Sequence, residues 1–186
     1  LGGAKALPSE LGHDEDTAKK RGTHLHLLLE VLPGTPPTQW PDLAMQMLTA
    51  GPDAALPSDV PALLTEAHTV LTTPELSPLF EPSTLAEVPV TADLPGLGRM
   101  HGVLDRLIIT DTAVRIVDFK TNVAVPTSAA ACPEGLLRQM GAYAAALTQI
   151  YPTHQIETAI LWTRTANLMH LPAKLTADAL SRACAP

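Results

Sequence analysis

The first clear pattern along the chain is a helical one. Thr17 is a possible helix cap, an apolar run with helical spacing follows at Leu25, Leu27, Leu28, Leu29 and Leu32, and Pro33 and Gly34 are typical of a helix end. Residues 1–16 show no such period, so we expect a flexible leader ahead of the folded domain. The folded part of the chain therefore begins with one long amphipathic helix.

Prolines interrupt the next part of the chain, residues 33–84, at short intervals. Two short amphipathic stretches, 43–48 and 63–71, lie between these breaks. Because proline ends helices and favours turns, this segment predicts a few short helices joined by tight turns. It shows little obvious chemistry.

After Thr84 the apolar positions change to a period of two, which is typical of half-buried strands. The expected elements, in order, are strands at 85–91, 100–109 and 114–120, a helix at 135–150, strands at 156–163 and 168–171, and a helix at 176–183. This order predicts an α/β sandwich, with a central mixed sheet of about five strands flanked by helices. We expect residues 17–186 to form a single domain that includes the proline-rich segment.

Composition narrows the functional classes. The chain has 186 residues, 46% of them hydrophobic, and a net charge of −7. Nucleic-acid-binding proteins that work alone are usually basic, so the negative net charge argues against a free-standing nucleic-acid-binding protein. The negative charge is compatible with a nuclease site, because metal-binding carboxylates are acidic. It also suggests that another module delivers the DNA.

Cysteine content and hydropathy exclude further classes. Two cysteines, Cys132 and Cys184, are too few for a four-cysteine zinc or iron–sulfur site, and we expect free thiols. No apolar run reaches the ~20 residues that span a bilayer, and no secretory signal is recognisable. We expect a cytoplasmic protein that does not contact membranes. Because the sequence begins at Leu1, we also expect it to be one piece of a longer polypeptide.

The strongest chemical signal comes from two neighbouring strands. If a two-residue turn at Asp111-Thr112 joins them, directly opposed residues have numbers that sum to 223, and Asp105 faces Asp118. Lys120 shares the face of Asp118. Phe119 points the other way, where we expect it near Leu104.

Two opposed carboxylates have Cβ atoms about 5 Å apart, and their like charges destabilise a sheet. A divalent cation between Asp105 and Asp118 turns that repulsion into a binding site, and oxygen ligands suit Mg²⁺ or Mn²⁺. Lys120 on the same face could orient a water molecule or stabilise charge on phosphorus, so the set suits phosphodiester hydrolysis. The alternative interpretation is that these residues are merely exposed strand charges.

Four motifs in order make the sequence similar to a known family. They are Arg21-Gly22-Thr23-His24-Leu25-His26, Gly102-x-x-Asp105, Asp118-Phe119-Lys120 and Gln139-x-x-x-Tyr143. Together they resemble the RecB-type nucleases of the PD-(D/E)xK superfamily, most closely the nuclease domains of AddA-type helicase–nucleases. The resemblance covers roughly residues 17–170 and implies a restriction-endonuclease-like sandwich.

The resemblance also implies roles for individual residues. His26, Asp105, Asp118 and the carbonyl of Phe119 match the metal ligands of the family, and Lys120 matches the catalytic lysine. Taken alone, a histidine in a helix would more often be structural.

Three further residues are less clearly assigned. Glu87 resembles an acidic residue of the preceding strand, which supports the metal through water or forms a salt bridge at the rim. Gln139 and Tyr143 match a pair that lies beside the active site and helps to hold DNA or the lysine. The alternative is that this pair belongs to an ordinary amphipathic helix.

The family implies a function for the whole chain. We expect a Mg²⁺-dependent DNA nuclease, with Mn²⁺ as a substitute and without an iron–sulfur cluster, which acts on a single strand in the bacterial cytoplasm. A helicase motor of the same polypeptide would deliver that strand, and an AddB-type subunit would be the partner; the sequence contains no phosphate-binding loop of its own. Two alternatives remain: an inactive nuclease-like fold that serves as an interaction module, and a stand-alone endonuclease, which would need a larger basic patch.

Overall fold

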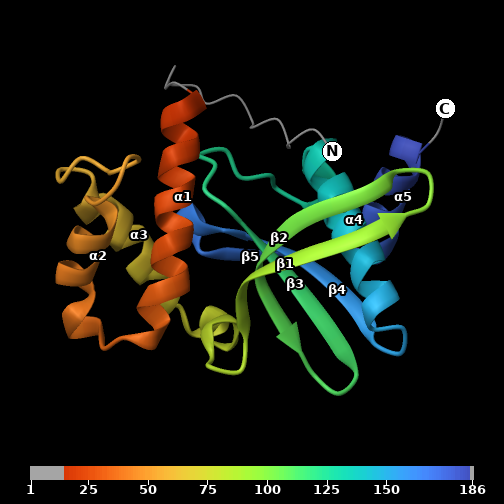
Figure 1. Cartoon of the computed structure of the whole chain (residues 1–186), viewed down its shortest axis with the longest axis horizontal. Coiled ribbons are helices and arrows are strands. Elements are labelled where there is room, and N and C mark those ends of the chain that lie inside the picture. The colour runs from red at the N-terminus through yellow and green to blue at the C-terminus, as the bar shows by residue number, and fades with distance from the viewer. Residues whose placement is uncertain (1–14, 185–186) are drawn as a thin grey trace.

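A five-stranded mixed sheet forms the centre of the protein. The computed structural model describes residues 15–184, and its strands lie in the order β1-β2-β3-β4-β5 (Figure 1). Only β3 and β4 run parallel; the other neighbours are antiparallel. The strands are β1 Leu85–Leu94, β2 Gly98–Ile109, β3 Ala113–Lys120, β4 Gln155–Trp162 and β5 Asn167–Leu171.

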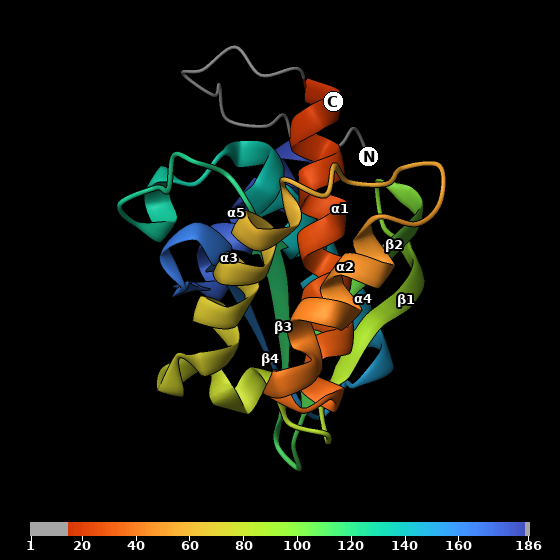
Figure 2. The same cartoon turned by 90° about the vertical axis from the view of Figure 1, so that its left-hand side faces the viewer.

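Helices cover both faces of this sheet. The chain crosses from β3 to the parallel strand β4 through a long helix, as parallel pairs require. Figures 1 and 2 show α1 to α3 on one side of the sheet, with α4 and α5 on the other. The helices are α1 Glu15–Val31, α2 Trp40–Leu48, α3 Val60–Thr72, α4 Glu134–Ile150 and α5 Ala173–Cys184.

Each side of the sheet has its own hydrophobic core. Alternate residues of β3 divide between them, since Val114 and Ile116 pack beneath α4, whereas Val117 and Phe119 pack beneath α1 to α3. This is the period of two that the sequence shows. The predicted sandwich, with about five strands in a mixed sheet, is therefore confirmed.

The proline-rich segment belongs to the second core. It forms α2, α3 and the 3-10 helix η3 Pro74–Phe80, and their apolar faces pack with Leu25, Leu28 and Leu29 of α1. Most of the leader expected at residues 1–16 lies outside the described residues. The part of it that is described, from Glu15, is already helical.

The end of α1 is tied to its surroundings by two side chains. The last carbonyls of a helix have no partner within it. The Arg106 guanidinium donates to the carbonyl of Leu29, in the last turn of α1, at 2.8 Å. The Trp40 indole donates to the carbonyls of Leu32 and Thr35, in and after the 3-10 turn that follows α1, at 3.1 and 3.0 Å. These bonds fix the end of α1 against the sheet and the turn after it against α2.

The predicted hairpin between β2 and β3 is present. The ladder pairs Arg106 with Val117 and Ile109 with Val114, so the sum of 223 holds along these positions. A two-residue turn closes it, with the Thr110 amide donating to the Ala113 carbonyl at 2.9 Å. The ladder stops at Arg106, one residue short of Asp105.

The expected contact of Phe119 with Leu104 is wrong. Leu104 packs beneath α4, in the same core as Leu107, although strict alternation would place residues three apart on opposite faces. The side chains of β2 therefore change face between these positions, at Asp105 and Arg106. Phe119 lies in the other core, beneath α1 to α3.

Among the described residues, no helix combines the length and apolar character needed to cross a membrane.

The packing of α4 on α5 gives a prediction of stability. A Cβ atom at Gly141 would lie 2.3 Å from the backbone oxygen of Thr176, so Gly141→Ala should force the helices apart. We expect a loss of about 1–3 kcal/mol in the free energy of unfolding, measured by urea denaturation. Gly34→Ala is the control, because a Cβ atom there meets nothing within 4 Å. Equal stability of the two variants would contradict the close packing.

Candidate active site

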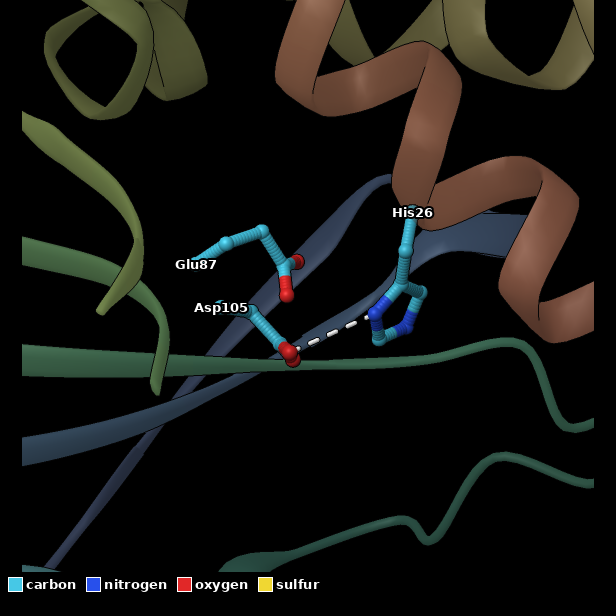
Figure 3. Close-up of side chains that lie close together, drawn as sticks. All are labelled: His26, Glu87 and Asp105. Atoms are coloured by element: carbon cyan, nitrogen blue, oxygen red, sulfur yellow. Dashed lines mark ion pairs between the residues drawn. The ribbon is translucent and has the colours of Figure 1, made fainter. Parts of the chain in front are cut away.

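Three potential metal ligands meet where α1 crosses β1 and β2. His26 of α1 lies with Nδ1 3.3 Å from Oδ1 of Asp105, and Glu87 of β1 points toward the same place (Figure 3). One ligand atom from each of the three lies within 4.8 Å of the others. The metal cluster, as we call His26, Glu87 and Asp105, therefore combines segments far apart in the sequence.

The backbone of Glu87 explains how β1 delivers its side chain there. Glu87 has φ +49°, a left-handed conformation that is rare for a residue other than glycine. The β1–β2 ladder pairs Ala86 with Arg106 and Val88 with Leu104, and omits Glu87 and Asp105 between them. Strain of this kind persists where the surrounding structure enforces it, and it occurs often at functional sites.

Asp105 is held by the backbone of β3. Its Oδ2 accepts a hydrogen bond from the amide of Phe119 at 2.5 Å, while Oδ1 faces His26. A buried N–H group needs a partner. Where the ladder between β2 and β3 ends, the carboxylate of Asp105 supplies it, and this fixes the orientation of the side chain.

Asp118 forms a second centre beside the metal cluster. Its Oδ2 lies 2.7 Å from Nζ of Lys120, and its Oδ1 accepts a hydrogen bond from Gln139 at 3.3 Å. In the described part of the chain, the group of potential ligands does not include Asp118. The expected direct opposition of Asp105 and Asp118 is thus incomplete: Asp105 turns toward α1, and Asp118 toward α4.

The charges of the two centres interact. Burial alone lowers the pKa of His26, but the hydrogen bond and charge of Asp105, with the charge of Asp118, raise it above its ordinary value. Burial, reinforced by the charge of Asp105, raises the pKa of Glu87. Negative charge therefore accumulates where a cation would relieve it.

Burial also affects the ion pair between Asp118 and Lys120. It raises the pKa of the Asp118 carboxyl, and the nearby ammonium group offsets part of that shift. Burial alone lowers the pKa of Lys120, but the charge of Asp118 and its hydrogen bond outweigh this and raise it. Lys120 is therefore an ammonium group that can donate hydrogen bonds.

Gln139 and Tyr143 connect α4 to the Asp118-Phe119-Lys120 motif of β3 and to the Gly102-x-x-Asp105 motif of β2. The amide of Gln139 donates to Asp118 and also to the hydroxyl of Tyr143 at 3.2 Å. Tyr143 in turn donates to the carbonyl of Val103 at 3.2 Å. The pair thus supports the carboxylate that holds Lys120.

The ring of Tyr143 explains Gly102. A Cβ atom at Gly102 would lie 2.5 Å from Cε1 of this ring and 2.9 Å from its hydroxyl oxygen. The ring of Tyr143 therefore occupies the position that a side chain would take at Gly102 of the Gly102-x-x-Asp105 motif.

Sequence reasoning missed the aromatic support beneath the metal cluster. His26 meets Phe119 edge-on at 5.6 Å between ring centroids, and Phe119 lies 6.2 Å from Phe80 of η3. The guanidinium of Arg106 lies over Phe80 at 5.1 Å, and it is the group that also binds the end of α1. The proline-rich segment therefore contributes to the site, although nothing in its pattern indicated this.

A second connection that was missed reaches the strand of Lys120. Arg21 of α1 forms an ion pair with Glu66 of α3. Glu66 accepts a hydrogen bond from Thr163 at 2.6 Å, and the Thr163 hydroxyl also lies 3.2 Å from the carbonyl of Lys120. These polar residues lie in three separate segments and belong to no common motif, so no sequence spacing could have revealed the network.

The metal cluster fits a divalent cation. It offers two carboxylates, the ligand type that suits Mg²⁺ or Mn²⁺, and one imidazole. Asp118, whose charge acts on His26, is a further candidate. A role for the Phe119 carbonyl as a ligand remains a prediction.

Comparison with known protein families agrees with this site. Residues 3–176 match the PD-(D/E)XK nuclease superfamily. The chain belongs to this superfamily, whose members are nucleases and generally depend on divalent metals. Its sheet and flanking helices are consistent with the restriction-endonuclease-like fold. No curated protein matches the chain.

The fit of Tyr143 against Gly102 leads to a stability prediction. Gly102→Ala should cost about 1–3 kcal/mol in urea denaturation, because the ring must move. In a Tyr143→Leu background the same substitution should cost much less. A cost that is equal in both backgrounds would show that the ring is not the obstacle.

The strained backbone of Glu87 leads to a further prediction of stability. Glu87→Gln and Glu87→Gly both remove the charge, but only glycine relieves the left-handed strain. The left-handed conformation costs a residue other than glycine about 1–2 kcal/mol. Glycine removes this cost, but it also makes the unfolded chain more flexible, which offsets part of the gain in stability. In EDTA, the glycine variant should unfold at higher urea concentration than the glutamine variant, while both bind Mn²⁺ more weakly than the parent in calorimetry. A glycine variant less stable than the glutamine variant would contradict the strain.

Proposed function

We propose that this chain is the nuclease domain of an AddA-type helicase–nuclease and hydrolyses phosphodiester bonds of DNA. The observation that carries the proposal is the position of the Asp118–Lys120 pair directly beside His26, Glu87 and Asp105. Superfamily membership supports the reaction class, and the four ordered motifs support the AddA type.

The metal in this proposal is Mg²⁺, with Mn²⁺ as a substitute. His26, Asp105 and Asp118 would hold it, with Glu87 beside them and the Phe119 carbonyl as a further ligand. When bound, the cation supplies Lewis-acid polarisation of a phosphoryl oxygen and a source of nucleophilic water.

The residues of the chain supply the remaining chemistry. Lys120, as an ammonium group, donates hydrogen bonds to the attacking water or to the oxygens that gain charge on phosphorus. Asp118 orients Lys120, and Gln139 and Tyr143 hold Asp118 in place. Both support groups come from α4, whose buried residues pack on the sheet.

The cellular context is part of the same proposal. A motor of the same polypeptide would unwind duplex DNA and deliver one strand to this site, with an AddB-type subunit as partner, during double-strand-break repair in the bacterial cytoplasm. The net charge of −7 supports this, because a domain with so little attraction for phosphate depends on delivery. Cleavage would be exonucleolytic in the full complex.

Cleavage of single-stranded DNA tests the proposal. We expect cutting of a linear strand in Mg²⁺ or Mn²⁺, none in EDTA, and none by Asp118→Ala, which should also bind Mn²⁺ more weakly in calorimetry. Lys120→Ala should keep most of its metal affinity and lose roughly 10²-fold or more in rate, the scale of one transition-state donor.

The matched controls are Lys174→Ala and Asp178→Ala. These residues form an ion pair of the same 2.7 Å length, but on the exposed surface of α5. They should leave cleavage unchanged. A domain that binds Mn²⁺ but cuts no strand in any metal would favour the alternative, an inactive interaction module.

A further inference from the structure

Gly22 lies in the interior of α1, four residues before His26. Glycine weakens a helix interior relative to alanine, because it orders a more flexible backbone and buries no side chain. A glycine at such a position therefore needs a reason, either in its own conformation or in what approaches it.

The described part of the chain gives no such reason. A Cβ atom at Gly22 would meet a single neighbouring atom, Oγ1 of Thr121, at 3.6 Å, which is an ordinary van der Waals contact. Gly102 and Gly141 differ, since Cβ atoms there would lie 2.5 and 2.3 Å from their neighbours. Gly22 is also not among the residues of positive φ.

The position of Gly22 relative to the metal cluster is informative. Residues four apart share one face of a helix, so Gly22 lies on the same face of α1 as His26, about 6 Å along the axis. Helical side chains tilt toward the N-terminus, so a side chain at Gly22 would extend farther along this face. The missing side chain leaves the helix backbone open to close approach beside the cluster.

One cation lies farther along the same face. Lys19 is exposed and one turn before Gly22. Its neighbours Lys20 and Arg21 form ion pairs with Asp53 and Glu66. The exposed ammonium group of Lys19 adds a positive charge to the face of α1 that carries Gly22.

A second cation lies across Thr121. The exposed side chain of Arg164 donates from Nε to the carbonyl of Thr121 at 3.3 Å, and this threonine is the residue whose hydroxyl borders Gly22. The bond anchors one side of the guanidinium and leaves its terminal nitrogens for another acceptor. Thr121 directly follows Lys120, so Arg164 belongs to the surroundings of the site.

We propose that the surface of α1 at Gly22, between Lys19 and Arg164, binds the sugar–phosphate backbone of the DNA strand next to the phosphodiester that is cut. The bare helix allows the strand to approach closely, and the two cations bind phosphate. This subsite rests on the proposed nuclease function and adds the path of the strand on the Gly22 side of the metal cluster.

The test uses the full chain and the substitution Gly22→Ala. Because alanine is the better helix former and its Cβ meets no close atom, the variant should melt roughly 2–4 °C higher than the parent. Its affinity for Mn²⁺ in calorimetry should be unchanged. A role of Gly22 in packing predicts the opposite change in melting temperature.

Binding of a labelled single-stranded oligonucleotide then measures the subsite. In a Lys120→Ala background with Mn²⁺, where cleavage is slow, we expect Gly22→Ala to raise Kd about 10-fold or more, and Gly22→Leu to raise it further. In the parent background, Gly22→Ala should raise KM for DNA. Lys19→Ala should reduce the slope of log Kd against log salt by roughly one.

Two controls keep this measurement specific. Gly34→Ala also adds a Cβ atom in open space, but in the turn after α1, and should not change DNA affinity. Lys174→Ala removes an exposed lysine of α5 and should leave the salt dependence as it is.

The outcomes separate the two proposals. Cleavage by the parent together with unchanged binding by Gly22→Ala would overturn the subsite and leave the nuclease function intact. A lower melting temperature of Gly22→Ala would likewise assign the glycine to packing. A parent that binds the strand without cutting it would contradict the nuclease function, while weaker binding by Gly22→Ala would still support the subsite. A parent that neither binds nor cuts would overturn both.

Discussion

Asp105 carries the constraint on which the candidate site depends: its carboxylate completes the backbone hydrogen bonding of β3. The ladder between β2 and β3 ends at Arg106, and one oxygen of Asp105 accepts the hydrogen bond from the Phe119 amide. If Asp105 turned away, it would leave a buried N–H group without a partner, which is unfavourable. The other oxygen is thereby aimed at His26. The backbone of β3 holds this side chain in place before any ligand binds.

Support for the site comes from both faces of the sheet because β2 changes face at this point. Beneath α4, Gln139 and Tyr143 hold Asp118, and Tyr143 occupies the space above Gly102. Beneath α1, Phe119 supports the imidazole of His26. Precise sites need such surrounding groups, because side chains on rigid elements keep their geometry only when their neighbours hold them.

Much of the fold followed from local patterns. Alternation located the strands, Pro33 and Gly34 located the end of α1, and the two-residue turn set the register of β2 and β3. The register failed to place Leu104 relative to Phe119, because it assumed unbroken alternation along β2. The break coincides with the positive φ of Glu87, and no local signal marks a glutamate for that conformation.

The motifs indicated which side chains carry the chemistry but not which residues support them. Phe80 and Glu66 lie in a segment without a recognisable pattern, and they reach the site through tertiary contacts alone. Such contacts depend on how three helices pack on the sheet, which periodicity does not specify. The separation of Asp118 from the metal cluster has the same origin, since one of its oxygens is bonded to Gln139 of α4 and the other to Lys120 of β3.

The bond from Arg106 to the carbonyl of Leu29 joins residues 77 apart in the chain. Closing so large a loop costs conformational entropy, which contacts formed by the docked helix must offset. His26 reaches Asp105 only once α1 has docked, so a chain that is still folding has no complete ligand set. The capacity to bind metal, and with it any capacity to cut nucleic acid, would then arise only in the finished domain, and a nascent or partly unfolded chain would be harmless to the DNA around it.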